Sequence, residues 1–240
     1  MGIPTSNVHA FLDAPDFGFL RVVLGKAQHL RYKLFLKRRH DGVVVENVCG
    51  APLVVVPGVL NPRLMRTGEF FAQQLAAQLP ERNAAVLDMG TGSGVCAVVA
   101  ARHVRHVVAV DINPAAVRCT RINVLINGLE ERVEVLEGDL FAPLAERRFD
   151  VILFNPPFVH GTPRDDPDRA WRSTDVVERF AGQLRARLTR SGFALVLLST
   201  FGGSAREFVR QFHHHGFELT VAAEREFVNE RLAIFKVIPS

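Results

Sequence analysis

Cysteine is scarce in this chain of 240 residues, and long apolar runs are missing from it. The three cysteines, Cys49, Cys96 and Cys119, are odd in number, lie far apart and match no metal-ligand or redox spacing. This excludes a disulfide framework and favours a reducing, cytoplasmic environment. No apolar run approaches the roughly 18 residues that a membrane-spanning helix needs, and the N-terminus shows no basic-then-apolar export signal. We therefore expect neither membrane insertion nor secretion.

The charge balance excludes little. Lys and Arg number 29 against 25 Asp and Glu, which gives a formal net charge of +4. Such a mildly basic chain permits an acidic or nucleic-acid partner but does not require one. A hydrophobic content of 48% is ordinary for a folded globular protein.

From about Ala84 onward, apolar β-branched runs alternate with helical patterns. Several runs are apolar without alternation, as expected for strands covered on both faces. This order predicts an α/β fold with a doubly wound parallel sheet. Only a short polar link precedes the last run, so the final strand should form a hairpin and run antiparallel. The seven expected strands are Ala85–Met89, His106–Val110, Val133–Leu136, Val151–Phe154, Phe193–Leu198, Phe217–Ala222 and Leu232–Ile238.

Residues 1–60 differ from this pattern, and residues 61–240 should form the main domain. Asp41-Gly42 between the apolar runs Arg31–Leu36 and Val43–Val48 is a hairpin signal, and Leu53–Val56 offers a third strand. We expect a small N-terminal extension with a basic β-hairpin that leans on the main domain. Its cationic side chains could recognise substrate, including phosphates of RNA.

A glycine-rich turn follows the first strand of the main domain. Asp88 is followed by Gly90, Thr91, Gly92 and Gly94, and a helical pattern begins after them. Glycines let a ligand approach the backbone, and a helix start offers free N–H groups. A dinucleotide enzyme would carry its third glycine where Val95 stands, and Asp88 would repel a pyrophosphate. A carboxylate there suits the ammonium group of S-adenosylmethionine (SAM), which has no phosphate.

Two further acids end the next two strands. Asp111 can accept hydrogen bonds from both ribose hydroxyls, and its neighbour Ile112 joins the expected cofactor contacts. Asp139 can accept from the adenine amino group while Leu140 packs on the ring. Three acids at three consecutive strand ends, beside a glycine turn, predict a SAM site. No metal site is expected.

The loop after Val151–Phe154 reads Asn155-Pro156-Pro157-Phe158. An amide or base amine is a poor nucleophile because its lone pair is delocalised. The Asn155 side-chain oxygen and the Pro156 carbonyl can each accept one N–H of such a group, which aims the lone pair at the methyl carbon and stabilises the charge that develops. Phe158 offers a flat face for stacking. We expect Asn155, Pro156 and Phe158 to be the catalytic residues, with Asn155 also contacting SAM.

These motifs resemble the class I SAM-dependent methyltransferases of the small-domain group, and above all the HemK/PrmC-type release-factor glutamine methyltransferases. The resemblance runs from about Thr67 to the C-terminus. It is carried by Val86–Ala97, Val107–Pro114, Arg121–Gly128, Glu137–Leu140 and Phe149–Phe158. It implies a Rossmann-like seven-stranded sheet, and it places Thr67 near the cofactor.

The resemblance implies N-methylation of a protein glutamine, in a translation factor or a ribosomal protein. The glutamine methyltransferases usually carry Tyr where Phe158 stands, and Phe occurs there in relatives that methylate ribosomal RNA guanine. An exocyclic base amine of structured RNA or DNA is therefore the second expectation. A SAM-binding interaction module without catalysis is an alternative of another class.

Overall fold

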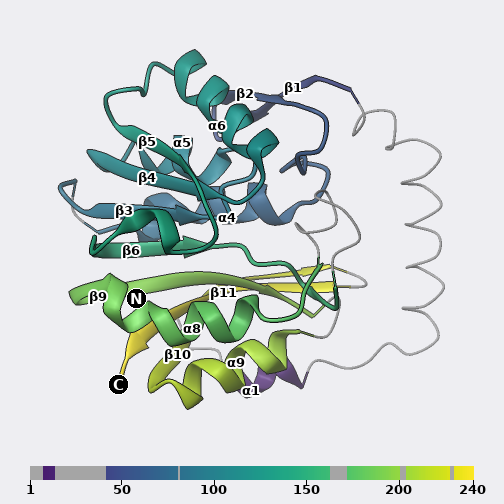
Figure 1. Cartoon of the computed structure of the whole chain (residues 1–240). Helices are drawn as coiled ribbons and strands as arrows, with labels where there is room; N and C mark the ends of the chain where they lie inside the picture. The colour runs from purple at the N-terminus through teal and green to yellow at the C-terminus, as the bar shows by residue number, and fades with distance from the viewer. Residues whose placement is uncertain (1–7, 14–41, 81, 163–171, 201–203, 228–229) are drawn as a thin grey trace.

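The computed structural model describes residues 8–13, 42–80, 82–162, 172–200, 204–227 and 230–240. Within them, a short helix α1 (Val8–Leu12) precedes a two-stranded hairpin and then a strand–helix series (Figure 1). The helices that follow are α4 (Thr67–Gln78), α5 (Val95–Ala100), α6 (Pro114–Ile126), the 3-10 turn η2 (Ala142–Leu144), α8 (Val176–Arg187) and α9 (Ala205–His214).

One seven-stranded sheet forms the centre of the molecule, with the spatial order β10-β11-β9-β6-β3-β4-β5. Its strands are β3 (Ala85–Met89), β4 (His106–Asp111), β5 (Val133–Glu137), β6 (Phe149–Phe154), β9 (Leu188–Ser199), β10 (Phe217–Phe227) and β11 (Glu230–Pro239). The pairs from β5 through β9 are parallel, whereas β11 is antiparallel to both β9 and β10. The predicted sheet with an antiparallel last strand is confirmed.

Side chains of each central strand alternate between two hydrophobic clusters. Val86 and Val151 face the cluster that contains α4, α5 and α6, while Leu87 and Ile152 face the cluster that contains α8 and α9. Figure 1 shows these helices in two layers, one on each side of the sheet. Because both faces are covered, the strands read as continuous apolar runs in the sequence.

The N-terminal hairpin joins β1 (Val44–Val48) to β2 (Ala51–Val55) in antiparallel register. Its turn is therefore Cys49-Gly50, and its two strands match the expected runs Val43–Val48 and Leu53–Val56, whereas the Asp41-Gly42 turn belongs to the expected pairing of Val43–Val48 with Arg31–Leu36. The expected strand at Arg31–Leu36, with its basic residues, lies outside the described residues. The hairpin packs on the helices that cover one face of the main sheet, since β2 contacts α5 and α6, and Val48 and Leu53 belong to the same cluster as α4 and α5.

The short helix α1 packs on the opposite face from the hairpin. Phe11 is buried and meets Phe235 edge-on, with 5.2 Å between ring centroids. Arg206 and Arg231 donate to the carbonyls of Leu12 and Ala10. The two described parts of residues 1–60 thus pack on different sides of the sheet.

The helix starts agree with the sequence signals in part. Asn113 caps α6 by accepting from the Ala115 N–H, as its position before Pro114 predicts. At α9, Ser204 and Glu207 have the spacing of a capping box, but among the described residues the Ser204 side chain makes no cap hydrogen bond. At α8, Asp175 occupies the cap position without capping, and the Ser173 hydroxyl accepts from the N–H groups of Asp175 and Val176 instead.

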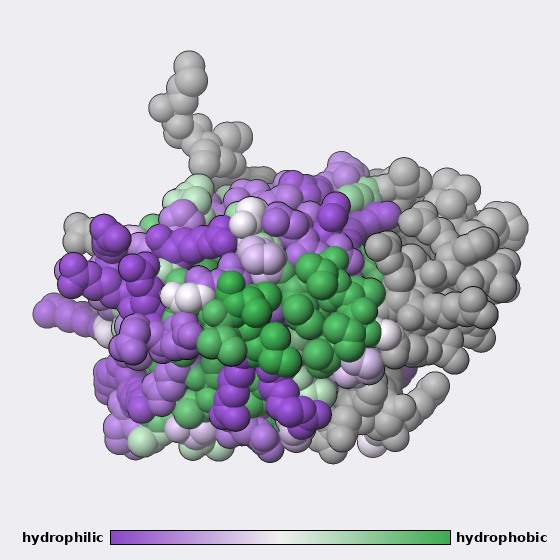
Figure 2. All heavy atoms as spheres, turned by 90° about the horizontal axis from the view of Figure 1, so that it is seen from above, coloured by the Kyte–Doolittle hydropathy of each residue, from purple (hydrophilic) through white to green (hydrophobic). Residues whose placement is uncertain are grey.

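Seen from above, apolar side chains gather in one patch on the face that carries α6 (Figure 2). Among the described residues, the exposed large apolar side chains of α6 are Ile122, Leu125 and Ile126. They lie on the outer side of the helix, whose inner side packs on β2 and β5.

Candidate cofactor and substrate site

The topology brings the predicted site residues to one edge of the sheet. Strands β5, β4, β3 and β6 are adjacent and parallel, so their carboxyl ends lie side by side. Asp88 lies near the end of β3, Asp111 ends β4, Asp139 follows β5, and Asn155 follows β6. In open α/β sheets this edge is where ligands bind.

The glycine turn after β3 has the backbone that its sequence predicts. Gly90, Gly92 and Gly94 all have positive φ angles, of 66°, 58° and 78°. At Gly94, the first residue before α5, an added Cβ would lie 2.8 Å from the Thr120 Cγ2 atom. The N–H groups of Gly90 and Thr91 both donate to the Val110 carbonyl, at 2.8 and 3.0 Å, which fixes the turn against β4. The turn is therefore held before any ligand arrives.

Asp88 is buried inside this turn. Its Oδ2 atom accepts from the Thr91 hydroxyl at 2.7 Å and from the Ala97 N–H at 3.0 Å, so it links the strand to the start of α5. Burial raises the pKa of Asp88 to about 7, although the two hydrogen bonds favour the ionised form. A cationic group beside this carboxylate would favour its ionised form and lower its pKa.

Asp111 braces the same turn from β4. Its Oδ2 atom accepts from the Gly92 N–H at 2.8 Å, and its Oδ1 atom accepts from the Asn113 N–H at 2.9 Å. Burial also raises the pKa of Asp111. Ile112 beside it is 43% exposed, a high value for so apolar a side chain, and it leaves an apolar surface at the cofactor edge.

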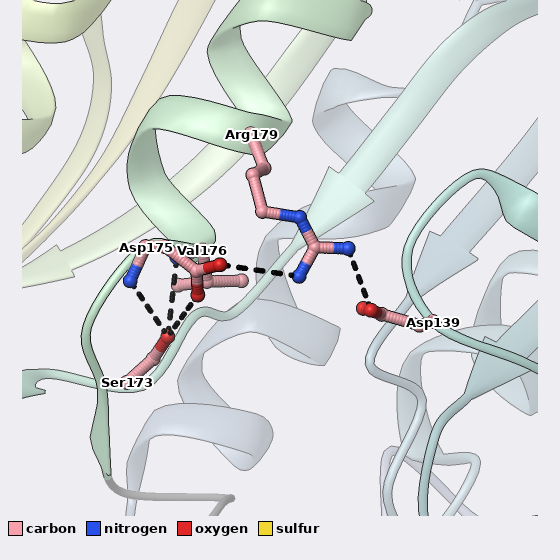
Figure 3. Close-up of polar contacts among 5 residues, drawn as sticks. All are labelled: Asp139, Ser173, Asp175, Val176 and Arg179. Carbon is pink, nitrogen blue, oxygen red and sulfur yellow. Dashed lines mark hydrogen bonds and ion pairs between the residues drawn. The ribbon is translucent and has the colours of Figure 1, made fainter. Parts of the chain in front are cut away.

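Asp139 pairs with an arginine that the sequence reading did not single out. The Asp139 Oδ2 atom accepts from Arg179 Nη2 at 2.6 Å, and Arg179 Nη1 lies 3.5 Å from Asp175 Oδ2 (Figure 3). The hydrogen bond to Asp139 raises the pKa of Arg179. Leu140, next to Asp139, has a φ of 48° and is buried in the hydrophobic cluster of α8.

Asn155 and Thr67 meet, as the sequence reading expects of two residues at one site. Asn155 Nδ2 donates to the Thr67 hydroxyl at 3.3 Å, across 88 residues of chain. The Asn155 Oδ1 atom is buried and has no hydrogen-bond partner among the described residues. An acceptor in that state costs free energy unless a ligand satisfies it.

The remaining loop residues are more enclosed. Pro156 is buried, and Phe158 is 6% exposed within the cluster that contains α4 and α5. Phe158 therefore has core contacts in this structure, and its stacking on a substrate stays a prediction. After it, β7 (Val159–His160) pairs with β8 (Arg172–Ser173) in parallel.

A buried polar network positions Thr67, and the sequence reading missed it. Asn61 is buried; its Nδ2 atom donates to Glu46 Oε1 at 2.8 Å, and its Oδ1 atom accepts from the N–H of Arg63 at 3.0 Å. Arg63 in turn lies 3.5 Å from Glu69 on α4. The network ties the hairpin to the first turn of α4. The signal was the Asn-Pro-Arg sequence before the helix, but Glu46 is 15 residues away and has no local mark.

A second buried amide links the hairpin to the glycine turn. Asn123 on α6 donates from Nδ2 to the carbonyls of Val54 and Ser93, both at 2.7 Å, and accepts from the Val54 N–H at 2.7 Å. Beside it, the Thr120 hydroxyl donates to the Gly92 carbonyl at 3.2 Å. These hydrogen bonds therefore connect β2 of the hairpin to α6, and α6 to the glycine turn.

Within the described part of the chain, no three His, Cys, Asp or Glu side chains are grouped as a metal site would require. In the same residues, no helix combines the length and the apolar character needed to cross a lipid bilayer.

The residues fit SAM as a ligand. The Asp88 carboxylate beside the turn could pair with an ammonium group, Asp111 and Asp139 are acceptors for hydroxyl and amino groups, and the glycine turn allows close approach. The buried Asn155 oxygen adds an acceptor where a nitrogen substrate would lie.

Comparisons with known proteins identify a family model and several relatives that this chain matches. A family model described as methyltransferase small domain matches residues 60–227. The release factor glutamine methyltransferase of Shewanella oneidensis is 31% identical over 218 residues, which cover 85% of this chain and 72% of that enzyme. The enzyme of the same name from Geobacter sulfurreducens is 40% identical over 116 residues, 48% of this chain; the chain spans only 39% of that relative's length.

A solved structure shares the fold. A 16S rRNA methyltransferase of T. thermophilus, in complex with AdoMet and guanosine, superposes with a TM-score of 0.59 at 22% identity. The superposition covers 82% of this chain and 50% of that one.

Proposed function

The chain belongs to the methyltransferase small domain family of SAM-dependent methyltransferases, and from this we propose that it methylates the nitrogen of a planar amide or amine. The first-choice substrate is a glutamine side chain of a protein, either a translation factor or a ribosomal protein. The matches to release factor glutamine methyltransferases support this choice.

One observation carries the proposal: within the described part of the chain, the buried Asn155 Oδ1 atom has no hydrogen-bond partner, while Asn155 Nδ2 donates to Thr67. The Thr67 bond fixes the plane of the amide and leaves the oxygen to accept an N–H of the substrate. The Pro156 carbonyl follows in the chain and would accept the second N–H. Holding both hydrogens on one side lets the nitrogen lone pair point to the methyl group.

When bound, SAM supplies an electrophilic methyl group on its sulfonium. The protein's part is to position the two reactants and to stabilise charge. As the nitrogen gains positive charge, Asn155 Oδ1 strengthens its hydrogen bond, so it stabilises the transition state more than the ground state. Asp88, Asp111 and Asp139 would hold the ammonium, the ribose and the adenine, and Ile112 and Leu140 would flank the ring.

The second candidate substrate is an exocyclic amine of an RNA base. Phe158 in place of tyrosine and the shared fold with a 16S rRNA methyltransferase support this candidate. The same pair of acceptors would grip an amide or a base amine, because both groups are planar and carry two hydrogens.

A labelling experiment separates these substrates. The protein is incubated with methyl-labelled SAM and a cell lysate, and the products are treated with nuclease or with protease. Label that survives nuclease but is lost to protease indicates a protein substrate, and the reverse indicates nucleic acid. Tight SAM binding without any transfer would contradict the proposal and favour a non-catalytic SAM-binding module.

Asn155→Ala tests the proposed catalytic role. Transfer should fall by about 10²- to 10³-fold, because the lost acceptor acts on developing charge. Asn47→Ala, which removes an exposed asparagine of β1, is the matched control and should leave transfer unchanged. If Asn155→Ala retained full activity, Asn155 would lose its catalytic assignment.

A further inference from the structure

Arg179 on α8 connects Asp139 to the segment that follows the Asn155 loop. Its guanidinium lies between two carboxylates, 2.6 Å from Asp139 Oδ2 and 3.5 Å from Asp175 Oδ2 (Figure 3). Asp139 follows β5, and Asp175 precedes α8, so the contact spans two segments 36 residues or more apart in the chain. A planar guanidinium restricts the orientation of the carboxylate it binds.

A second contact on the same turn of α8 is independent of charge. Phe180, the neighbour of Arg179, stacks on Phe141 at 5.3 Å and on Phe154 at 4.3 Å between ring centroids. Phe141 is two residues after Asp139, and Phe154 directly precedes Asn155. The start of α8 therefore contacts both the segment that follows Asp139 and the segment that precedes Asn155.

The cap of α8 extends this connection to the substrate loop. Ser173 accepts from the N–H groups of Asp175 and Val176, and its own carbonyl accepts from the Gly161 N–H at 3.0 Å. Because β7 pairs with β8, these contacts connect the start of α8, which carries Arg179, to the segment after Phe158.

We propose that Arg179 is a positioning residue that orients the Asp139 carboxylate toward the adenine amino group and thereby sets the enzyme's preference for an adenosyl cofactor. This inference rests on the proposed contact between Asp139 and adenine. The ion pair engages Oδ2 of Asp139, and a carboxylate has a second oxygen, Oδ1, which can accept from the amino group.

The expected effect is modest because the pair is partly open to solvent. The side chains of Arg179 and Asp139 are 40% and 44% exposed. Ion pairs at such positions are weakened by water and salt. Arg179 should therefore tune cofactor recognition rather than decide whether the protein folds.

The test is the binding of S-adenosylhomocysteine and S-inosylhomocysteine, measured by calorimetry. The inosyl compound has a keto oxygen where adenine has its amino group, so a correctly oriented carboxylate rejects it. Arg179→Met keeps the apolar stem and should lower the adenosyl preference by about two- to fivefold. Asp139→Asn should lower it further, and Arg179→Met should add nothing in the Asp139→Asn background. Arg179→Lys should retain part of the preference.

Arg185→Met is the matched control on the same helix. Arg185 donates to the Gly216 carbonyl at the far end of α8, so its loss should leave the preference unchanged. An unchanged preference in Arg179→Met, with a lowered one in Asp139→Asn, would overturn the inference and leave the adenine contact standing. An unchanged preference in Asp139→Asn would remove the adenine contact itself. Tighter adenosyl binding by Arg179→Met would mean that Arg179 competes with adenine, which also overturns the inference.

Discussion

In the proposed reaction, Thr67 would set the orientation of the Asn155 amide. Its hydroxyl receives the Nδ2 hydrogen bond of Asn155, and it stands at the start of α4, where the Asn61 network fixes the backbone. An amide with one fixed end loses less orientational freedom when a substrate binds the other end. The Asn61 network and the Asn155 amide are thus connected through Thr67.

Thr67→Val removes that hydroxyl while keeping the shape of the side chain. We expect kcat to fall about three- to tenfold, because Asn155 can rotate, with little change in SAM affinity. Thr67→Ser keeps the hydroxyl and should retain most of the activity. Steady-state kinetics with the methylated substrate would show this, and equal kcat values for the valine variant and the native protein would contradict it.

Asp88 should make stability depend on pH. Its pKa is about 7 in the folded protein and 3.8 in an ordinary carboxyl group, so between about pH 4 and pH 7 the folded state holds a proton that the unfolded state has released. The contribution to the free energy of unfolding is therefore full below pH 4 and is lost as pH rises to 7, by as much as about 4 kcal/mol.

Asp88→Asn isolates this effect, since the amide cannot titrate but keeps an oxygen for Thr91 and Ala97. The free energy of unfolding of the variant minus that of the native protein should increase from pH 4 to pH 7 and then level off. Urea unfolding at a series of pH values measures it. Parallel pH profiles for the two proteins would show that Asp88 is not protonated in the folded state.

The polar residues at the site divide into those that sequence can predict and those that it cannot. Asp88, Asp111 and Asn155 were predicted because each follows or ends a recognisable apolar strand, and the parallel sheet brings those ends together. Arg179 and Glu46 were missed because their partners lie far away in the chain, and an arginine on a helix or an acid on a strand is ordinary on its own. Only the tertiary structure shows that each meets a residue of the site.

At the level of elements, the start of α5 combines two separate demands on Gly94. Its φ of 78° disfavours any side chain, and a Cβ would lie 2.8 Å from Thr120 Cγ2. Gly128 after α6 has a similar φ of 63°, but nothing lies within 4 Å of the Cβ position. A comparison of the two glycines therefore separates the cost of backbone strain from the cost of steric crowding.

Gly128→Ala should lower the free energy of unfolding by about 1 kcal/mol from backbone strain alone. Gly94→Ala should cost about 1–3 kcal/mol more, because Thr120 or the turn must move, and it should weaken SAM binding. Thermal unfolding and calorimetry measure the two effects. Equal costs at the two glycines would mean that Thr120 does not crowd the turn.

The strands of the main sheet are predictable because their apolar runs are buried on both faces, whereas the turn between β1 and β2 has no local mark in the sequence. The turn uses Cys49 and Gly50, with φ angles of 52° and 72°. Two successive positive φ angles suit a tight hairpin, but cysteine is not a residue that marks such a turn. Ser204 and Asp175 are residue types that favour helix N-caps, but among the described residues neither side chain makes a cap hydrogen bond.

Across the whole molecule, the elements on the two faces of the sheet contact the candidate site through different residues. The hairpin and α4 to α6 support the glycine turn and Thr67, through Asn123 and Asn61. On the other face, α8 reaches the site through Arg179 and Phe180, while α1 packs away from it beside Phe235. The described parts of residues 1–60 pack on both faces of the sheet.

This difference predicts that α1 stabilises the fold without taking part in the reaction. Phe11→Ala removes a buried ring from the cluster of α9 and β11, and it should lower the free energy of unfolding by about 2–4 kcal/mol. The affinity for SAM and kcat should stay unchanged at temperatures where the variant is folded, because Phe11 contacts Phe235 on β11, and β9 separates β11 from the strands that carry the candidate site. Denaturant unfolding and SAM titration of the same preparation test both halves. A change in SAM affinity at full folding would mean that α1 is coupled to the cofactor edge across the sheet.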